Sequence, residues 1–363
     1  MNDLEQRLAT AVAAMEQRDP KLGQELKDKV RPEATERVTR DAEERPRRRM
    51  AERVGGDSEA PPQRRRLRTP ETIVLRTGRP VLTVRNDSPE LLFRDTESEV
   101  WRERLQKATD QIHRAVLASG RVEVEHHPTF NWIGTGWLVR ADVIVTNRHV
   151  AKEFARRQGT QFRFRPGTLG RTMRASMDFL EEFGRADERT FQIKQVLHIE
   201  GDSGPDLALL RVEQSGALRL AAPIGLSPHA PIAGQQVATI GYPARDSRIP
   251  EMDLMEEIFG DVFDKKRLAP GQVIRATKRD VQHDCSTLGG NSGSTVLDLE
   301  SGDAVGLHFA GRFLEANFAV PAAVVEQRLN EVLNSEGRST VTVGGIASQP
   351  AQVMPATTAG GRR

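Results

Sequence analysis

A serine in a glycine-rich turn is the residue best suited to nucleophilic chemistry in this 363-residue chain. Ser292 lies in the segment Leu288-Gly-Gly-Asn-Ser-Gly-Ser-Thr-Val296, which runs directly into a β-type sequence. Such a turn can present a hydroxyl while backbone N–H groups converge on one point, which suits the oxyanion of an acyl-transfer reaction. Taken alone, the segment also fits an ordinary turn. Its interpretation therefore depends on a base and an acid elsewhere.

A histidine and an aspartate in suitable contexts precede this serine. Residues 134–149 form a predicted β-hairpin that runs into His149, and Asp206 begins the buried-strand sequence Asp-Leu-Ala-Leu-Leu-Arg-Val. The order is His, Asp, Ser, with separations of 57 and 86 residues. Individually, His149 fits a partly buried histidine at a strand end and Asp206 a turn or cap residue. Together with Ser292 they fit a catalytic triad.

These motifs resemble those of the chymotrypsin-like serine proteases, in particular the bacterial trypsin-like peptidases. The triad of that family runs in the order His, Asp, Ser, whereas subtilisin-like and α/β-hydrolase enzymes use other orders. The resemblance covers residues 120–334 and implies a serine endopeptidase without cofactor or metal, acting on a protein or peptide substrate. It implies Ser292 as nucleophile, His149 as general base and Asp206 as the residue that orients the imidazole. The N–H groups of Gly290 and Ser292 would form the oxyanion hole.

Residues around the nucleophile also bear on specificity. Digestive members of the family carry Asp just before the serine, where it pairs with a newly cleaved N-terminus. Asn291 has no charge for that pair, and Ser286 replaces the aspartate with which trypsin binds Arg or Lys, so neither feature is expected here. Thr287 and His308, with Gly311 after them, are similar to the glutamyl endopeptidase branch, which holds an acidic side chain there. This similarity implies cleavage after Glu or Asp; a small apolar pocket with His308 as a wall residue is the alternative.

Short β-type runs are the main elements that must position these residues. They occur between residues 122 and 309 and are separated by Gly, Pro and Asp turns, which favours antiparallel barrels over a parallel α/β sheet. The resemblance implies an all-β, chymotrypsin-like fold of two six-stranded antiparallel β-barrels. A helix is predicted over residues 98–117, with Trp101 on its apolar face, and a C-terminal helix begins at Pro321. The acidic segment 250–263 is predicted to be a helix or lid.

Aromatic content divides the chain into parts. All 17 aromatic residues lie between Phe93 and Phe318, so both ends lack the large side chains of a packed core. The arginine clusters near the N-terminus fit a solvated tether, since no aromatic residue there could stack on nucleic-acid bases. The early helix of this arm is a candidate docking site for a partner protein. We predict a mainly helical and disordered charged arm (1–70), a lead-in segment with an amphipathic helix (71–119), the protease domain (120–334) and a disordered tail (335–363).

Several functional classes are disfavoured by what the sequence lacks. Apolar stretches such as residues 318–325 fall far short of the roughly 20 residues that cross a bilayer, and the N-terminus does not resemble a secretory signal. Cys285 is the only cysteine, so we expect no intramolecular disulfide, no cysteine zinc site and a cytoplasmic location. His126 and His127 lack further ligands at metal-binding spacing. The alternative function is a catalytically idle protease-like module that binds peptides or acts as a scaffold.

Overall fold

The structure is a computed structural model that describes residues 78–93, 96–214, 218–245, 252–312 and 316–343. The predicted arm over residues 1–70, with its docking helix, lies outside the described residues, as do the first part of the lead-in segment and residues 344–363. Within the described part, no helix is long and apolar enough to cross a membrane.

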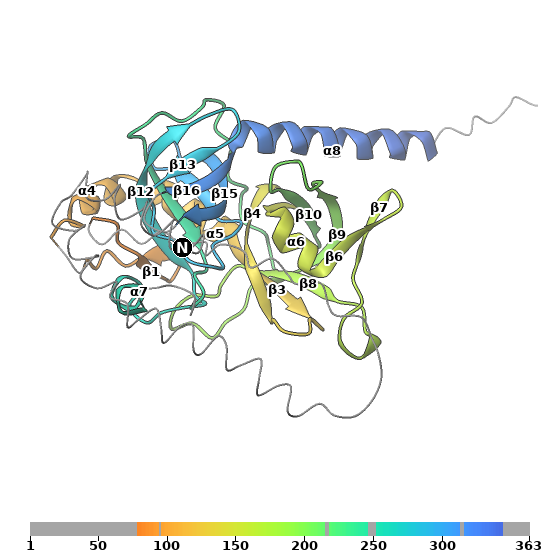
Figure 1. Cartoon of the computed structure of the whole chain (residues 1–363), viewed down its shortest axis with the longest axis horizontal. Coiled ribbons are helices and arrows are strands. Elements are labelled where there is room, and N and C mark those ends of the chain that lie inside the picture. Colours follow the sequence, from red (N-terminus) through yellow and green to blue (C-terminus); the bar gives the residue numbers. More distant parts are fainter. Residues whose placement is uncertain (1–77, 94–95, 215–217, 246–251, 313–315, 344–363) are drawn as a thin grey trace, which may run out of the picture. The chain divides into compact units, whose positions relative to one another are not determined.

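Six antiparallel strands close the first β-barrel, in the order β10-β5-β4-β3-β8-β9 (Figure 1). All four residues of the short strand Val-Ile-Val-Thr are buried, and their branched side chains suit a strand packed on both faces. This strand ends immediately before the segment that carries the predicted base. The strands are β3 (Ser119–Glu125), β4 (Trp132–Arg140), β5 (Val143–Thr146), β8 (Arg174–Asp178), β9 (Thr190–Ile199) and β10 (Ala208–Val212).

Six further antiparallel strands form the second barrel, which closes where β11 pairs with β12. The hairpin of β1 (Leu82–Arg85) and β2 (Ser88–Pro89) extends this barrel from one end of β12. The fold is therefore the all-β pair of six-stranded barrels that the sequence predicted. The strands of this barrel are β11 (Gln236–Gly241), β12 (Arg267–Ala276), β13 (Val281–His283), β14 (Thr295–Asp298), β15 (Ala304–Arg312) and β16 (Ala316–Pro321).

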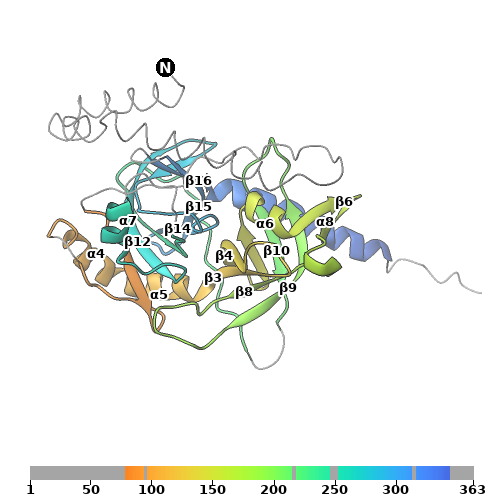
Figure 2. The same cartoon turned by 60° about the horizontal axis from the view of Figure 1, so that its bottom comes forward.

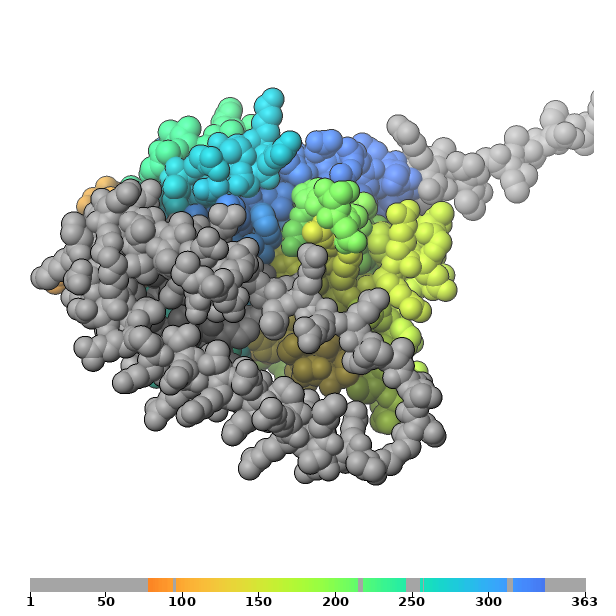
Figure 3. Space-filling model, in the orientation of Figure 1, coloured from red at the N-terminus to blue at the C-terminus, as the bar shows by residue number. Residues whose placement is uncertain are grey.

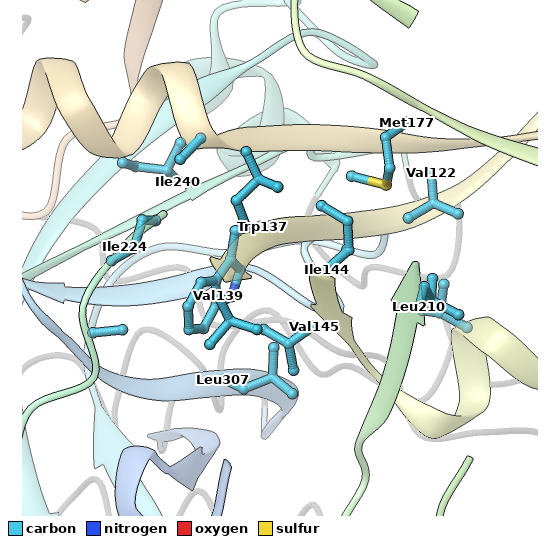
Figure 4. Packing of buried hydrophobic residues seen from close by; sticks show 14 of the residues in the cluster. Val122, Trp137, Val139, Ile144, Val145, Met177, Leu210, Ile224, Ile240 and Leu307 are labelled. Carbon is cyan, nitrogen blue, oxygen red and sulfur yellow. The ribbon is translucent and has the colours of Figure 1, made fainter. Parts of the chain in front are cut away.

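One hydrophobic core continues from the first barrel into the second. Trp137 and Val139 on β4 are fully buried, and Figure 4 shows them among Ile144 of the same barrel and Ile240 and Leu307 of the other. Burying an aliphatic or aromatic side chain of this size stabilises a fold by roughly 1.5–3 kcal/mol. The shared core therefore holds the two barrels in a fixed relation, which a site built from both of them requires.

The predicted helix over residues 98–117 is two helices, α4 (Val100–Lys107) and α5 (Thr109–Ala118). They meet at Ala108, whose backbone leaves the helical region with φ −96° and ψ 15°. The hydroxyl of Thr109 donates to the carbonyl oxygen of Gln106 at 2.7 Å, a local bond that competes with a continuous helix. Figures 1 and 2 show α4 beside β12 of the second barrel.

A buried lysine ties this lead-in segment to both barrels. Lys266, just before β12, donates from Nζ to the carbonyl oxygens of Val116 on α5 at 2.9 Å and Phe179 at 2.8 Å. Its Nζ also lies 3.9 Å from a carboxylate oxygen of the fully buried Glu182. Burial lowers the pKa of Lys266 to about 8, although Glu182 opposes this shift. The lead-in helix is thus part of the folded body.

Three helices lie among the barrel strands or follow them. The short helix α6 (Arg148–Phe154), which the sequence analysis did not predict, follows β5 and leads into a hairpin of β6 (Ala155–Gln158) and β7 (Gln161–Phe164). The predicted helix within residues 250–263 is α7 (Met252–Phe259). The closing helix α8 (Ala322–Val343) continues nine residues past the predicted boundary at 334, so residues 335–343 are helical rather than part of a tail.

Candidate active site

The glycine-rich turn before β14 has a conformation that only glycine adopts without strain at two positions. Gly290 and Gly293 have φ angles of +90° and +91°. A Cβ atom at Gly293 would lie 2.0 Å from the carbonyl oxygen of Thr135, and one at Gly290 would lie 2.4 Å from that of Tyr242. The two glycines therefore let the turn around Ser292 bend sharply and approach neighbouring backbone closely. This is the local reason for the Gly-Gly-Asn-Ser-Gly sequence.

Hydrogen bonds from the first barrel fix this turn in place. The N–H of Thr135 on β4 donates to the carbonyl oxygen of Ser292 at 2.8 Å, and its hydroxyl donates to that of Gly290 at 2.8 Å. Thr146, the last residue of β5, donates from Oγ1 to the carbonyl oxygen of Thr135 at 2.7 Å. The turn that bears the predicted nucleophile belongs to the second barrel in sequence, and the first barrel holds part of its backbone as well.

The predicted base and acid form a direct pair. Nδ1 of His149 on α6 lies 2.6 Å from one carboxylate oxygen of Asp206, and the backbone N–H of His149 donates to the other at 3.0 Å. Asn147 donates from its side-chain amide to the carbonyl oxygen of Asp206 at 2.9 Å. The ionised carboxylate favours the tautomer in which Nδ1 carries the proton, so Nε2 is left to accept one.

The carboxylate of this pair stays ionised despite its burial. Burial by itself opposes the charge on Asp206, but the hydrogen bond and the charge interaction with His149 hold the pKa of the carboxyl below its usual value. The backbone N–H of His149 and the guanidinium of Arg148 act in the same direction. A carboxylate in this state can orient an imidazole and stabilise its charged form.

A glycine on β4 shows that the serine and the histidine share one location. A Cβ atom at Gly134 would lie 3.0 Å from the carbonyl oxygen of Ser292 and 2.8 Å from the side chain of Val150, the neighbour of His149. A Cβ atom at Gly293 would lie 2.7 Å from the hydroxyl of Thr146, three residues before His149. The turn thus lies against the end of β5, three residues before His149. The structure pairs His149 with Asp206 and places the backbone of Ser292 and Val150, the neighbour of His149, around the same glycine of β4.

Comparisons with known proteins show what the chain is similar to. Residues 134–307 match the family described as the trypsin-like peptidase domain. A probable serine protease of Lysobacter enzymogenes is 28% identical over 247 residues, which cover 61% of this chain. The chain spans only 64% of the length of that relative. The crystal structure of Deg5 is also similar, with 21% identity and a TM-score of 0.42, over 66% of this chain and 95% of that one.

Two of the predicted specificity residues, Thr287 and Gly311, lie next to one buried asparagine. Thr287 donates from its hydroxyl to Oδ1 of Asn317 at 2.9 Å, and Asn317 donates in turn to the carbonyl oxygen of Cys285 at 2.5 Å. Asn317 on β16 is paired in register with Gly311 on β15. Sequence reasoning missed Asn317, because only strand pairing brings it to a residue 30 positions away. The proton of the Thr287 hydroxyl is already donated within the protein.

His308 lies fully buried beside a second histidine. Its backbone carbonyl accepts the N–H of Gly293 at 2.9 Å, which places it next to the nucleophile turn. Nδ1 of His308 lies 3.3 Å from Nε2 of the equally buried His283. Burial, and after it the neighbouring His283 and His149, hold the pKa of His308 well below its usual value. The positive charge that would attract an acidic substrate side chain is therefore disfavoured before substrate binds.

The lead-in segment covers the remaining predicted specificity residue. The hydroxyl of Ser286 donates to the backbone carbonyl of Arg79 at 3.0 Å. The guanidinium of Arg79 pairs with Asp284 at 2.5 Å and lies over the ring of Trp101. Ser286 is 1% exposed, so residues outside the barrel strands seal this part of the site.

The other candidate groups do not form a second reaction centre. The thiol of Cys285 is buried, and burial raises its pKa, which disfavours the nucleophilic thiolate. Nδ1 of His127 accepts the backbone N–H groups of Thr129 and Phe130 at 3.2 and 3.0 Å. In the part of the chain that the structure describes, no group of three or more His, Cys, Asp or Glu residues could hold a metal ion.

Proposed function

We propose that the chain is a serine endopeptidase that hydrolyses peptide bonds through an acyl-enzyme on Ser292. The observation that carries this proposal is the pairing of His149 with Asp206 at 2.6 Å beside the glycine-rich turn of Ser292. The match of residues 134–307 to the family described as the trypsin-like peptidase domain supports the same reaction class. Burial of the turn, with Ser292 only 3% exposed, would keep bulk water from competing with the incoming carbonyl group.

In the acylation step, Oγ of Ser292 attacks the carbonyl carbon of the scissile bond while its proton passes to Nε2 of His149. The tetrahedral intermediate carries its negative charge on the former carbonyl oxygen. The N–H groups of Gly290 and Ser292 are assigned as donors to that oxygen. Collapse of the intermediate breaks the C–N bond, and the departing amine takes the proton from His149.

In the deacylation step, water attacks the ester carbonyl carbon and gives a proton to His149. The ester C–O bond then breaks, and Ser292 recovers its proton as the carboxylic acid product leaves. In both steps Asp206 would stabilise the transient imidazolium, and its depressed pKa keeps it available as an anion.

Replacement of the nucleophile tests this function. We expect Ser292→Ala to abolish turnover of a mixed peptide library and labelling by a fluorophosphonate probe, both of which the wild-type chain supports. Ser227→Ala, a hydroxyl that bonds the backbone of His229 at 3.0 Å on the surface, is the matched control. Equal hydrolysis by wild type and Ser292→Ala would exclude the proposal. Peptide binding without turnover by the wild type would favour the idle binding module instead.

We further propose that the residue before the scissile bond is Glu or Asp. Thr287 and His308 support this choice by their positions, and the hydroxyl of Thr287 would have to change partner from Asn317 to the substrate. His308 would take up a proton as the carboxylate binds, since burial disfavours its charge beforehand. Cleavage after Glu should therefore weaken with rising pH more steeply than cleavage after Gln.

A substrate panel that varies only this residue decides the specificity. We expect cleavage after Glu or Asp to be faster than cleavage after Gln, Leu, Phe or Arg. We also expect cleavage after Glu to depend more steeply on pH than cleavage after Gln. A preference for Phe, Leu or Arg would contradict the acidic specificity and leave the proposed hydrolysis itself untouched.

A further inference from the structure

The hairpin that follows the predicted base concentrates positive charge. Residues 155–174 contain six arginines and no acidic residue, whereas the whole chain has a net charge of only +2. Four of the six, Arg156, Arg157, Arg163 and Arg165, lie on or directly after β6 and β7. All four are exposed. We call residues 155–165 the arginine hairpin.

One face of the arginine hairpin packs on the barrel. The ring of Phe164 lies 6.0 Å from that of Phe154, and the ring of Phe162 lies 6.1 Å from the imidazole of His198 on β9. Because successive side chains of a strand point to opposite faces, the residues between these two phenylalanines and just after them face away from the barrel. Arg163 lies between them on β7, and the exposed Arg165 follows the strand and donates to the carbonyl oxygen of Lys152 on α6 at 2.7 Å.

Like charges are set directly opposite each other on the outer face. Arg156 on β6 is the register partner of Arg163 on β7. A pair of like charges at opposed positions destabilises a two-stranded sheet. None of the four arginines makes an ion pair with a carboxylate of the described residues. Figure 3 shows the yellow-green atoms of the hairpin exposed at the edge of the first barrel. A negatively charged partner on this face would therefore relieve the repulsion between the arginines.

The position of the arginine hairpin relates it to the leaving-group side of the reaction. His149 donates its proton to the departing amine, so the substrate chain after the scissile bond lies on the His149 side. From His149 the chain runs through α6 to Phe154 and reaches Arg156 two residues later. At the rises of a helix and a strand, this path spans on the order of 15 Å, the length of about four or five extended residues.

We propose that Arg156, Arg163 and Arg165 form a secondary binding site for an acidic stretch of the protein substrate. The stretch would begin about four or five residues after the scissile bond. This inference rests on the proposed function, because the substrate polypeptide is the polymer that catalysis itself brings to this side of His149. A polypeptide can also place an apolar side chain on Leu169, which is 94% exposed in the neighbouring loop, whereas a nucleic-acid backbone offers only sugars and charged phosphates there.

Kinetics on two matched peptides test the site. The peptides are identical up to the third residue after the scissile bond and then carry a run of either Glu and Asp or Gln and Asn; mass spectrometry follows cleavage at that one bond. We expect the acidic peptide to have a kcat/KM about five- to tenfold higher at low salt. The combined variant Arg156→Gln, Arg163→Gln and Arg165→Gln should remove this advantage and leave the neutral peptide unchanged.

A charge-matched control separates a specific site from a general field. The variant Arg275→Gln, Lys278→Gln and Arg279→Gln removes the same charge from exposed residues around the β12–β13 turn of the second barrel. It should keep the advantage of the acidic peptide. An equal loss in both variants, or an unchanged advantage in the arginine-hairpin variant, would overturn the proposal.

Binding to Ser292→Ala distinguishes this inference from the proposed function. Fluorescence anisotropy should show that the labelled acidic peptide binds Ser292→Ala through the three arginines, more weakly as salt rises. If the wild type hydrolyses the neutral peptide but the acidic run has no effect, only the secondary site is excluded. If no peptide is cleaved, the proposed endopeptidase function is excluded, and the secondary binding site, which depends on it, is excluded as well. Binding of duplex DNA or phosphatidylserine vesicles through these arginines, without binding of the acidic peptide, would overturn the proposal in favour of that partner.

Discussion

Two histidines flank the nucleophile turn in contrasting environments. His149 of the first barrel is 14% exposed in its side chain and pairs with a carboxylate, whereas His308 of the second barrel is fully buried and faces another imidazole. The adjacent carboxylate orients the imidazole of His149, whereas burial beside a second imidazole disfavours the charged form of His308. The comparison shows how one residue type can provide a proton acceptor on one side of a site and a neutral wall on the other.

Replacement of the Asp206 carboxylate, the partner of His149, should have the largest effect on catalysis. Asp206→Asn leaves an amide that can donate to Nδ1 of His149 and so favours the wrong tautomer. We expect kcat/KM to fall about 10⁴-fold, the loss seen when the triad aspartate of a serine protease is replaced. Asp202→Asn, an exposed acid paired with Lys152, is the control and should retain activity. A loss below tenfold in Asp206→Asn would mean that the pair does not act in catalysis.

A side chain at Gly293, where the nucleophile turn packs against β4, should lower the stability of the fold. Gly293→Ala places a Cβ against the carbonyl oxygen of Thr135 and strains a φ of +91°. We expect the free energy of unfolding to fall by about 2–5 kcal/mol in urea titrations. Gly159→Ala is the matched control, because Gly159 also has a positive φ but open space around its Cβ position. Similar losses in both variants would attribute the effect to backbone strain alone.

The second environment should make the fold sensitive to mild acid. Burial lowers the pKa of His283 to about 4, so the unfolded chain binds more protons than the folded chain between that value and the ordinary 6.5. The stabilisation from neutral His283 is therefore complete above pH 6.5 and declines as the pH falls toward 4. Between these two pH values, His283 alone lowers the free energy of unfolding by on the order of 3 kcal/mol.

Unfolding of His283→Gln between pH 7.5 and 5 checks this dependence. The melting temperature of the variant should fall less across this range than that of the wild type, while the exposed His113→Gln behaves as the wild type. Asp206 adds a loss in the same direction at lower pH, because its depressed pKa gives stability that is present above its usual pKa and lost as pH falls further. Identical slopes for His283→Gln and wild type would refute the neutral state of His283.

The smallest effect is expected at the asparagine behind Thr287. Asn317→Ala leaves the carbonyl oxygen of Cys285 without its side-chain donor and frees the Thr287 hydroxyl. Thermal unfolding should show a loss of about 1–2 kcal/mol, and the ratio of cleavage after Glu to cleavage after Leu should change. The exposed Asn334→Ala on α8 should change neither quantity. A changed stability with an unchanged cleavage ratio would confine Asn317 to a structural role.

Local sequence predicted most of the barrel strands, because alternation and branched residues act over a few residues, but it gave no run over β8, β13 or β16. It predicted one helix over residues 98–117 where the hydroxyl of Thr109 and the backbone of Ala108 produce two. It missed α6, whose seven residues are too few to show a clear periodicity. It also placed the end of the closing helix at 334, although α8 reaches Val343.

The sequence by itself determined the order of His149, Asp206 and Ser292 and the turn around the serine, since a tight turn with positive φ angles requires glycine at 290 and 293. Tertiary structure alone decided the state of the side chains around them. The side-chain oxygen of Asn317 accepts a hydrogen bond from the Thr287 hydroxyl. The backbone carbonyl of Arg79, 207 residues away, accepts one from the Ser286 hydroxyl, and closure of the second barrel buries His308. Burial, solvation and hydrogen-bond partners are set by chain segments distant in sequence, so no local pattern could specify them.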